Sequence, residues 1–218
     1  MPQKIALVTG ASRGLGAALA FDLAVRGWHV VAVARTVGGL EELDDRVKAL
    51  RLQGAGGLTL APMDVTDADA MAHLCRSIHD RWGGLQAWAH PAVHVAPLAP
   101  MGSLDARDWE KSINANALAT GKLIPLVEPL LRAGQGTAMF FDDPRAGQKF
   151  FGAYGASKAA QIALARSWAA ETAAIGPRVL IETPAPMPTA TRARFFPGEN
   201  RSMLSDCQTE AARLAALF

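Results

Sequence analysis

Several features that would point to a particular class of protein are scarce in this sequence. Its two cysteines, Cys75 and Cys207, form no disulfide framework and agree with a reducing compartment. The net charge of +2 is too small to predict binding to nucleic acid or to a membrane surface. No apolar run is long enough to span a bilayer, and the first run begins at Ile5, so we expect no signal peptide. These absences predict a cytoplasmic protein that binds neither nucleic acid nor a membrane.

The rest of the composition is that of a folded chain with a sizeable core. Half of the 218 residues are hydrophobic and 19% are charged, which differs from the profile of a disordered chain. The 20 glycines and 13 prolines are spread along the chain and form no linker. The length therefore predicts a single α/β domain over residues 1–218.

Short apolar runs alternate with longer segments in which apolar residues recur at helical spacing. The runs cover residues 5–8, 29–34, 58–63, 85–90, 137–141 and 179–182, and the helical segments cover 17–26, 40–52, 66–82, 103–132, 152–175 and 205–217. This alternation predicts βαβ units around a buried parallel sheet. We predict a Rossmann-type, doubly wound sheet of six strands in the order 3-2-1-4-5-6, with helices on both faces. Its ligand should lie beyond the carboxyl ends of the strands.

Two local features are also predicted. Thr66, followed by Asp69 three residues later, has the pattern of a helix N-cap. The proline-rich segment 184–200 is predicted to be irregular.

The first 26 residues contain the pattern around which the rest of the chain is arranged. The run 5–8 is followed by TGASRGLG at residues 9–16 and then by an Ala/Leu-rich helical segment. This order places free backbone N–H groups and the positive end of a helix dipole at the sheet edge, which suits a phosphate. Gly10 would form the tight turn, Gly14 would let a phosphate approach the backbone, and Gly16 would let helix and strand pack closely.

Two arginines lie where the adenosine end of a dinucleotide would bind. Arg13 is inside the glycine turn and Arg35 directly follows the second run, where NAD-binding chains carry an acidic residue. Guanidinium groups suit the extra phosphate of NADP, so we predict NADP(H) over NAD(H). The alternative is that both arginines are solvated surface residues. Asp64, after the third run, fits either a hydrogen bond from an adenine amino group or a helix cap.

Tyr154 is the only tyrosine, and Lys158 follows it four residues later in a predicted helix. Residues at this spacing share one face of a helix. A neighbouring cation favours the phenolate and lowers the pKa of a tyrosine from its usual value of about 10. The pair is therefore predicted to act as a general acid/base.

The sequence resembles the short-chain dehydrogenase/reductase family over nearly its whole length. The resemblance rests on TGASRGLG at 9–16, Asp64-Val65 after the third strand, Asn116, and YGASK at 154–158. It implies hydride transfer between a nicotinamide and a small carbonyl or alcohol, with Tyr154 as proton donor or acceptor. Lys158 would bind the nicotinamide ribose and lower the pKa of Tyr154. Asn116 would hold a water that relays protons, unless it is only a surface residue of its helix.

The resemblance also implies cofactor contacts, a substrate loop at about 184–204, and a homodimer or homotetramer formed through the 152–175 helix. The contacts would come from Gly10, Ser12, Arg13, Gly14, Leu15, Gly16, Arg35, Asp64, Val65, Ala89, Tyr154, Lys158, Pro184 and Thr189. Thr189 has the simpler alternative of a loop hydroxyl. No metal site is expected, because His73, Cys75 and His79 lack further ligands at suitable spacing.

Two segments depart from the family pattern. Where the family has Asn-Asn-Ala-Gly, this chain has Ala-His-Pro-Ala at 89–92, and Pro91 has no N–H to donate. We interpret His90 as a loop histidine. The serine expected shortly before the tyrosine is also absent, and Asp142 is its nearest equivalent. An ionised Asp142 would only accept hydrogen bonds and would raise the pKa of Tyr154.

Three roles remain open for Asp142. It is protonated and donates a hydrogen bond, it selects a substrate that carries a donor, such as an imine or amine, or it faces away from the site. The seventh strand that is usual in the family is also missing. The sequence thus predicts an NADP(H)-dependent oxidoreductase, with a weak or silent NADP(H)-binding sensor or oligomer subunit as the alternative.

Overall fold

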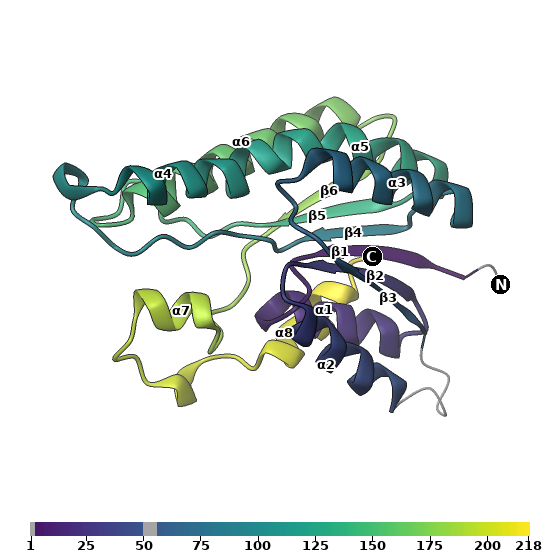
Figure 1. Cartoon of the computed structure of the whole chain (residues 1–218), viewed down its shortest axis with the longest axis horizontal. Helices are drawn as coiled ribbons and strands as arrows, with labels where there is room; N and C mark the ends of the chain where they lie inside the picture. The colour runs from purple at the N-terminus through teal and green to yellow at the C-terminus, as the bar shows by residue number, and fades with distance from the viewer. Residues whose placement is uncertain (1–2, 50–55) are drawn as a thin grey trace.

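The sheet has the predicted topology. The structure is a computed structural model that describes residues 3–49 and 56–218, so the end of the helix predicted over 40–52 lies outside the described residues. The strands are β1 (Ile5–Thr9), β2 (His29–Ala34), β3 (Leu58–Pro62), β4 (Ala87–His90), β5 (Thr137–Phe141) and β6 (Arg178–Glu182). They form one parallel sheet in the order β3-β2-β1-β4-β5-β6 (Figure 1), which confirms the prediction.

The strand order reverses at β1, which lies between β2 and β4. In this register Val8 is opposite Ala32 on one side and Ala89 on the other. The turn after β1 and the segment after β4 therefore leave the sheet next to each other. In doubly wound sheets a ligand binds in the crevice formed at such a reversal.

Alternate residues of β1 belong to two separate cores. Ala6 and Val8 share a core with α1 (Gly14–Val25), α2 (Val37–Lys48) and α8 (Cys207–Ala215), whereas Ile5 and Leu7 share a core with α3 (Ala68–Trp82), α5 (Ala119–Gly134) and α6 (Gly152–Thr172). Figure 1 shows the two groups of helices on opposite faces of the sheet. Burial on both faces explains why the strands are apolar almost throughout.

The start of α3 differs from the prediction. The N-cap is Asp67, whose side chain accepts a hydrogen bond from the Ala70 N–H at 3.0 Å. The Thr66 hydroxyl donates instead to Asp64 Oδ1 at 2.9 Å. Thr66 is therefore occupied in a turn one residue before the helix, and the stronger acceptor caps the helix.

Two longer segments are also divided differently from the prediction. The helical segment 103–132 contains α4 (Ala106–Ser112), a π-helical turn (Ile113–Leu118) and α5. The segment predicted to be irregular contains α7 (Ala190–Phe195), which begins where the Thr189 side chain accepts a hydrogen bond from the Arg192 N–H. A short 3-10 turn (Arg201–Met203) follows.

The described residues after β6 add no strand to the sheet, as predicted. They form α7, the 3-10 turn and α8, and α8 returns to pack against α1. Figure 1 shows α7 and the chain around it standing beyond the carboxyl edge of the sheet. This position places the 184–204 segment over the edge where a ligand is expected.

Candidate active site

The turn after β1 has the geometry that its glycine pattern requires. Gly10 and Gly14 have φ angles of +91° and +56°, which residues with side chains rarely adopt. A Cβ atom at Gly10 would lie 2.8 Å from the backbone of Ala92, and one at Gly16 would collide with the Gly10 carbonyl oxygen. The glycines therefore allow the turn, the helix and the segment after β4 to pack within contact distance.

The N-terminus of α1 is suited to an anion. Within the described residues, no side chain caps this helix, and its first turn holds no acidic group. Ser12 and Leu15 are half-buried beside it, and Arg13 is exposed at the N-cap position. Uncapped N–H groups at the positive end of a helix dipole attract a phosphate.

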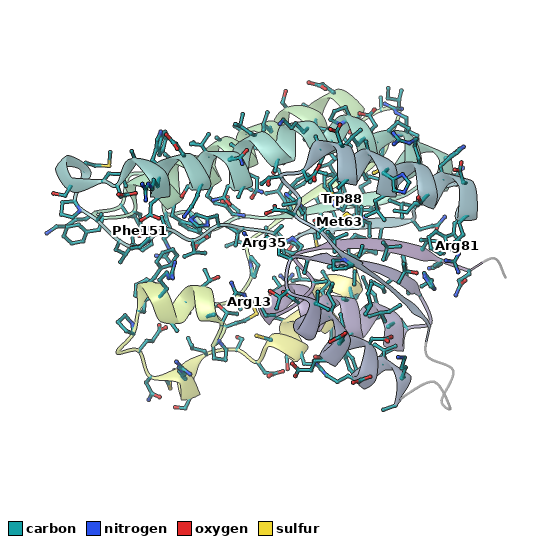
Figure 2. All side chains as sticks on the ribbon, viewed as in Figure 1. Arg13, Arg35, Met63, Arg81, Trp88 and Phe151 are labelled. Carbon is teal, nitrogen blue, oxygen red and sulfur yellow. The ribbon has the colours of Figure 1, made fainter. Side chains whose placement is uncertain are left out.

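Arg13 and Arg35 lie on the same side of the molecule. Figure 2 shows both at the edge where β1 and β2 end, whereas Arg81 lies at the opposite end of the sheet. The Arg35 side chain is 68% exposed and its Nη1 lies 3.7 Å from Asp64 Oδ2, which is a weak surface ion pair. Both guanidinium groups can therefore turn toward a phosphate.

Asp64 does not cap α3, as one of its two predicted roles required; it stabilises the turn before the helix. Its Oδ1 accepts hydrogen bonds from the Thr66 N–H at 3.0 Å and from the Thr66 hydroxyl at 2.9 Å. Val65 packs against the core beneath α3, and Ala89 is fully buried in β4. A hydrogen bond from Asp64 to an adenine group stays a prediction.

Tyr154 and Lys158 are both buried near the start of α6, with exposed fractions of 4% and 5%. Tyr154 Oη donates a hydrogen bond to Asp143 Oδ2 at 3.1 Å. The other oxygen of that carboxylate, Oδ1, lies 2.9 Å from Arg145 Nε. The carboxylate that meets the tyrosine is therefore Asp143, and not the predicted Asp142.

Asp142 points toward α6 in a different direction. Its N–H donates to the Glu182 carbonyl at 2.7 Å and so extends the pairing of β5 with β6 by one residue. This continuation gives Asp142 the same facing as Phe140, toward α6, where its Oδ2 lies 3.7 Å from the exposed Arg166. Asp142 is hydrogen-bonded to neither Tyr154 nor Lys158 in the described structure, but its charge raises the pKa of both residues. Which of the three roles it takes stays a prediction.

The pKa of Tyr154 is shifted in the direction opposite to the prediction. Burial raises this pKa well above its ordinary value, and the Asp143 carboxylate raises it further, while Arg145 opposes the rise. Burial also lowers the pKa of Lys158 to about 8. The causes of the Tyr154 shift are burial, Asp143, Arg145 and Asp142, so the predicted lowering by Lys158 is not among them. Tyr154 remains protonated at neutral pH.

Asn116 is fully buried in the π-helical turn, so the surface interpretation of this residue is wrong. Its Oδ1 accepts from the His94 N–H at 2.6 Å, and its Nδ2 donates to the His94 carbonyl at 3.0 Å and to Ser157 Oγ at 2.9 Å. The side chain thus ties the segment after β4 to α6. A water held by Asn116 stays a prediction.

His90 is not a loop residue. It ends β4 and is completely buried, and burial lowers its pKa to about 3. Its two ring nitrogens lie 2.6 Å from Thr9 Oγ1 and 3.1 Å from Thr120 Oγ1. Pro91 packs beside the glycine turn, close to Gly16. The segment that departs from the family pattern therefore makes defined contacts at the switch point.

Phe195 of the 184–204 segment packs against Tyr154 in an aromatic cluster. Phe151, Tyr154 and Phe195 form a buried cluster, in which the Tyr154 and Phe195 ring centroids are 4.8 Å apart. Figure 2 shows Phe151 on the carboxyl side of the sheet. Pro184 is half-buried after β6, and the Cγ2 of Thr189 lies close to Gly14. The loop thus joins the glycine turn to the tyrosine.

Sequence reasoning missed three side chains of this site, namely Asp143, Gln161 and Thr120. Asp143 is the second residue of an aspartate pair, and only the facing of β5 decides which of the two reaches Tyr154. Gln161 accepts a hydrogen bond from Lys158 Nζ at 2.6 Å and donates to Thr120 at 3.0 Å. The position of Gln161, three residues after Lys158, was the one available signal, because that spacing shares a helix face.

Metal ligation and membrane insertion find no support in the described residues. No group of three or more His, Cys, Asp or Glu side chains there could hold a metal ion. None of the described helices is both long enough and apolar enough to cross a bilayer.

Comparison with known proteins agrees with the fold. The family model described as short chain dehydrogenase matches residues 4–200. An uncharacterised oxidoreductase of Mycobacterium tuberculosis is 30% identical, over 98% of this chain and 66% of the relative. A cis-4-hydroxycyclohexanecarboxylate dehydrogenase of Sinomonas cyclohexanicum is 34% identical, over 81% of this chain and 70% of the relative. The chain thus spans slightly less than two thirds of the mycobacterial relative.

Solved structures resemble this one over nearly the whole chain. A short chain dehydrogenase from Pseudomonas syringae has a TM-score of 0.88 and 28% identity, covering 99% of this chain and 89% of that one. A short chain dehydrogenase from Shigella flexneri, complexed with NADP, has a TM-score of 0.84 and 25% identity, covering 95% and 87%. Because the family match covers most of the chain and agrees with the observed strand order, the protein belongs to the short-chain dehydrogenase family of oxidoreductases.

Proposed function

We propose that the protein is an NADP(H)-dependent oxidoreductase that transfers a hydride between the nicotinamide and a small carbonyl or alcohol, or an imine. The observation that carries this proposal is the burial of Tyr154 and Lys158 together, one helical turn apart, at the carboxyl edge of the sheet. Burying a lysine side chain costs free energy, and buried ionisable groups with shifted pKa values are concentrated at functional sites. Family membership supports the same class of reaction.

The residues at the sheet edge fit a dinucleotide phosphate. Gly10 and Gly14 have backbone angles suited to a turn around an anion, and the N-terminus of α1 carries no competing side chain among the described residues. Arg13 and Arg35 would hold the additional phosphate of NADP, which a family member from Shigella flexneri binds. Thr189 and Pro184 would lie toward the nicotinamide end.

Four side chains of the protein would have separate roles in the reaction. When bound, the nicotinamide would supply or accept the hydride. Tyr154 would give its proton to the substrate oxygen during reduction, and Lys158 would bind the ribose hydroxyls. Asn116 would hold the segment after β4 in place against α6. Phe195 would exclude water from the tyrosine.

Asp143 restricts the substrates that suit this site. A carboxylate only accepts hydrogen bonds, so Oδ2 repels a carbonyl oxygen placed at the tyrosine and attracts a group that donates. An alcohol hydroxyl and a protonated imine both donate. A test panel should therefore contain cyclic imines and their matched ketones. It should also contain cis-4-hydroxycyclohexanecarboxylate, the compound in the name of the Sinomonas relative.

Calorimetric titration with NADPH, NADH and their oxidised forms tests the cofactor. We expect NADPH to bind more tightly than NADH, and Arg35→Ala to weaken NADPH about tenfold or more while leaving NADH little changed. Arg81→Ala is the matched control, because Arg81 stacks on Trp82 at the opposite end of the sheet. Failure to bind any of the four nucleotides would overturn the proposal.

A second candidate is a binder of NADP(H) with little or no catalysis. It is favoured by the hydrogen bond from Tyr154 to Asp143 and by the raised pKa of the tyrosine, which make it a weak proton donor. Tight NADPH binding without turnover on any member of the panel would favour this candidate. Turnover of an imine or a ketone would favour the oxidoreductase.

We also propose a homodimer or homotetramer formed through the predicted 152–175 helix, within which α6 lies. Leu164 on α6 and Leu118 in the adjoining π-helical turn are 38% and 53% exposed, which leaves apolar surface uncovered in one chain. Light scattering should show an oligomer at micromolar concentration, and Leu164→Glu should shift it toward a monomer. Val25→Glu is the control, because Val25 is 47% exposed at the end of α1, which packs on the other face of the sheet from α6. A wild-type monomer would contradict this proposal.

A further inference from the structure

A chain of buried polar side chains runs from Lys158 into the centre of the sheet. Gln161, Thr120, His90 and Thr9 follow it in order, and each of these four residues has an exposed fraction of 0%. The successive distances are 2.6 Å, 3.0 Å, 3.1 Å and 2.6 Å. The members come from α6, α5, β4 and β1, so the chain joins four elements at the switch point of the sheet.

With the proton of His90 on Nε2, the donors and acceptors of this chain fit together as follows; the Thr9 hydroxyl also has the Ala89 carbonyl at 3.2 Å as a second acceptor. The Lys158 ammonium can only donate, so the oxygen of the Gln161 amide faces it and the amide nitrogen donates to Thr120 Oγ1. Thr120 gives its own hydrogen to the Asn116 carbonyl at 2.9 Å. Its remaining lone pair then accepts from His90 Nε2, and His90 Nδ1 accepts from the Thr9 hydroxyl.

This assignment requires a neutral His90 with its proton on Nε2. The strongly lowered pKa of His90 agrees with that state, since burial and the positive charge of Lys158 both disfavour a second proton. Thr120 then has its single donor and both lone pairs in use. The Gln161 amide is therefore held in one orientation, with Oε1 directed at the lysine.

Lys158 has few other groups to stabilise its charge. Among residues 3–49 and 56–218, no carboxylate lies within ion-pair distance of Nζ. Asp142 and Asp143 act on it from farther away, paired with Arg166 and Arg145. His90 is neutral, and Tyr154 is protonated at neutral pH. The amide oxygen of Gln161 is thus the nearest described acceptor for a buried ammonium.

We propose that Gln161 is a positioning residue that holds the Lys158 ammonium in place, and that Thr120 and His90 fix the orientation of its amide. An ammonium has three N–H groups, so a bond to Gln161 leaves two for the ribose hydroxyls of the cofactor. The proposal rests on the proposed function only for the role of Lys158 in binding the cofactor ribose. It also gives a role to His90, which lies in the segment that departs from the family pattern.

The first measurement is the titration of Lys158 in the protein without cofactor. The sequence contains six lysines, so carbon NMR of lysine-labelled protein gives few signals, and Lys158→Met identifies the one of interest. In the wild type its midpoint should lie near 8. Gln161→Leu removes the acceptor of the charged form, so the midpoint should fall to lower pH.

Thr120 provides a matched pair of variants with a control. Thr120→Val removes the acceptor of the Gln161 amide and should lower the Lys158 midpoint, whereas Thr120→Ser keeps the hydroxyl and should restore it. Thr172 is also buried, and its hydroxyl likewise donates to a carbonyl four residues back, that of Trp168 at 2.8 Å. Thr172→Val loses the same kind of bond outside the network, so the midpoint should not move.

A second readout separates this inference from the proposed function. If the enzyme is active, Gln161→Leu should lower kcat about tenfold, the usual effect of losing a hydrogen bond to a charged group, with a smaller change in KM. The NMR titration needs no cofactor, so a failure of NADPH binding leaves its result interpretable. Equal Lys158 midpoints in wild type, Gln161→Leu and Thr120→Val would overturn the inference. A shift of the Lys158 midpoint in Thr172→Val as large as that in Thr120→Val would overturn it as well. If Gln161→Leu does not fold, the Lys158 midpoints of Thr120→Val and Thr120→Ser test the inference.

Discussion

The Asp143–Tyr154 hydrogen bond gives the sharpest prediction about this site. Asp143→Asn keeps the shape of the side chain and removes its charge. Because the carboxylate stabilises the protonated phenol, its loss should lower the pKa of Tyr154. A hydrogen bond to a charged group contributes about 1.5–3 kcal/mol, which corresponds to a change of about ten- to a hundredfold in the ionisation of Tyr154.

The assay benefits from the composition of the chain. Tyr154 is the only tyrosine, so the ultraviolet absorbance of tyrosinate during an alkaline titration reports this residue alone. The ionisation of Tyr154 should begin at lower pH in Asp143→Asn than in the wild type. A tyrosine that releases its proton more readily is also a better acid, so carbonyl reduction should be faster in the variant, by up to about tenfold.

Asp142→Asn is the control, because Asp142 is adjacent in sequence and pairs with Arg166 on the surface of α6. Its longer-range effect on Tyr154 is weaker than that of Asp143. The Asp142→Asn titration should therefore resemble the wild type more closely than the Asp143→Asn titration does. An equal effect of the two substitutions, or no effect of Asp143→Asn, would refute the assignment of Asp143 as the partner of Tyr154.

Three further predictions concern stability. Gly16→Ala should destabilise the protein by about 2 kcal/mol in urea unfolding, because the new methyl group collides with the Gly10 carbonyl; unchanged stability would contradict the observed turn. Phe195→Ala should cost about 3 kcal/mol and expose Tyr154 to solvent, which quenching of its fluorescence would detect. His90 has a folded-state pKa near 3 and an ordinary value of 6.5, so only the unfolded chain takes up its proton between these pH values. Stability should therefore fall as the pH drops from about 6.5 toward 3, and a variant His90→Asn that folds should show a shallower fall.

The fold could be predicted from the sequence because its signals are local and repeated. Each strand is apolar enough to be buried on both faces, and each intervening segment has helical spacing, so the strand order followed from the general rule for such sheets. The glycine turn could also be predicted, because its geometry requires glycine. Gly10 and Gly14 have positive φ angles, and a side chain at position 16 would collide with the backbone. Even so, Asp67 and not the adjacent Thr66 caps the helix, because the Thr66 hydroxyl is bound to Asp64 and the Asp67 carboxylate accepts from the Ala70 N–H.

The candidate site was only partly visible in the sequence. The Tyr154–Lys158 pair and Asn116 could be named from spacing and resemblance, but their charge states could not, because a pKa depends on burial and on partners distant in sequence. Burial lowers the pKa of Lys158 and raises that of Tyr154, whereas the sequence predicted a lowered pKa for Tyr154. The sequence by itself determined the parallel sheet, the glycine turn and the residues at its carboxyl edge. The tertiary structure alone decided that Asp143 and not Asp142 meets the tyrosine, and that Gln161 meets the lysine, because these contacts depend on how strands and helices face one another.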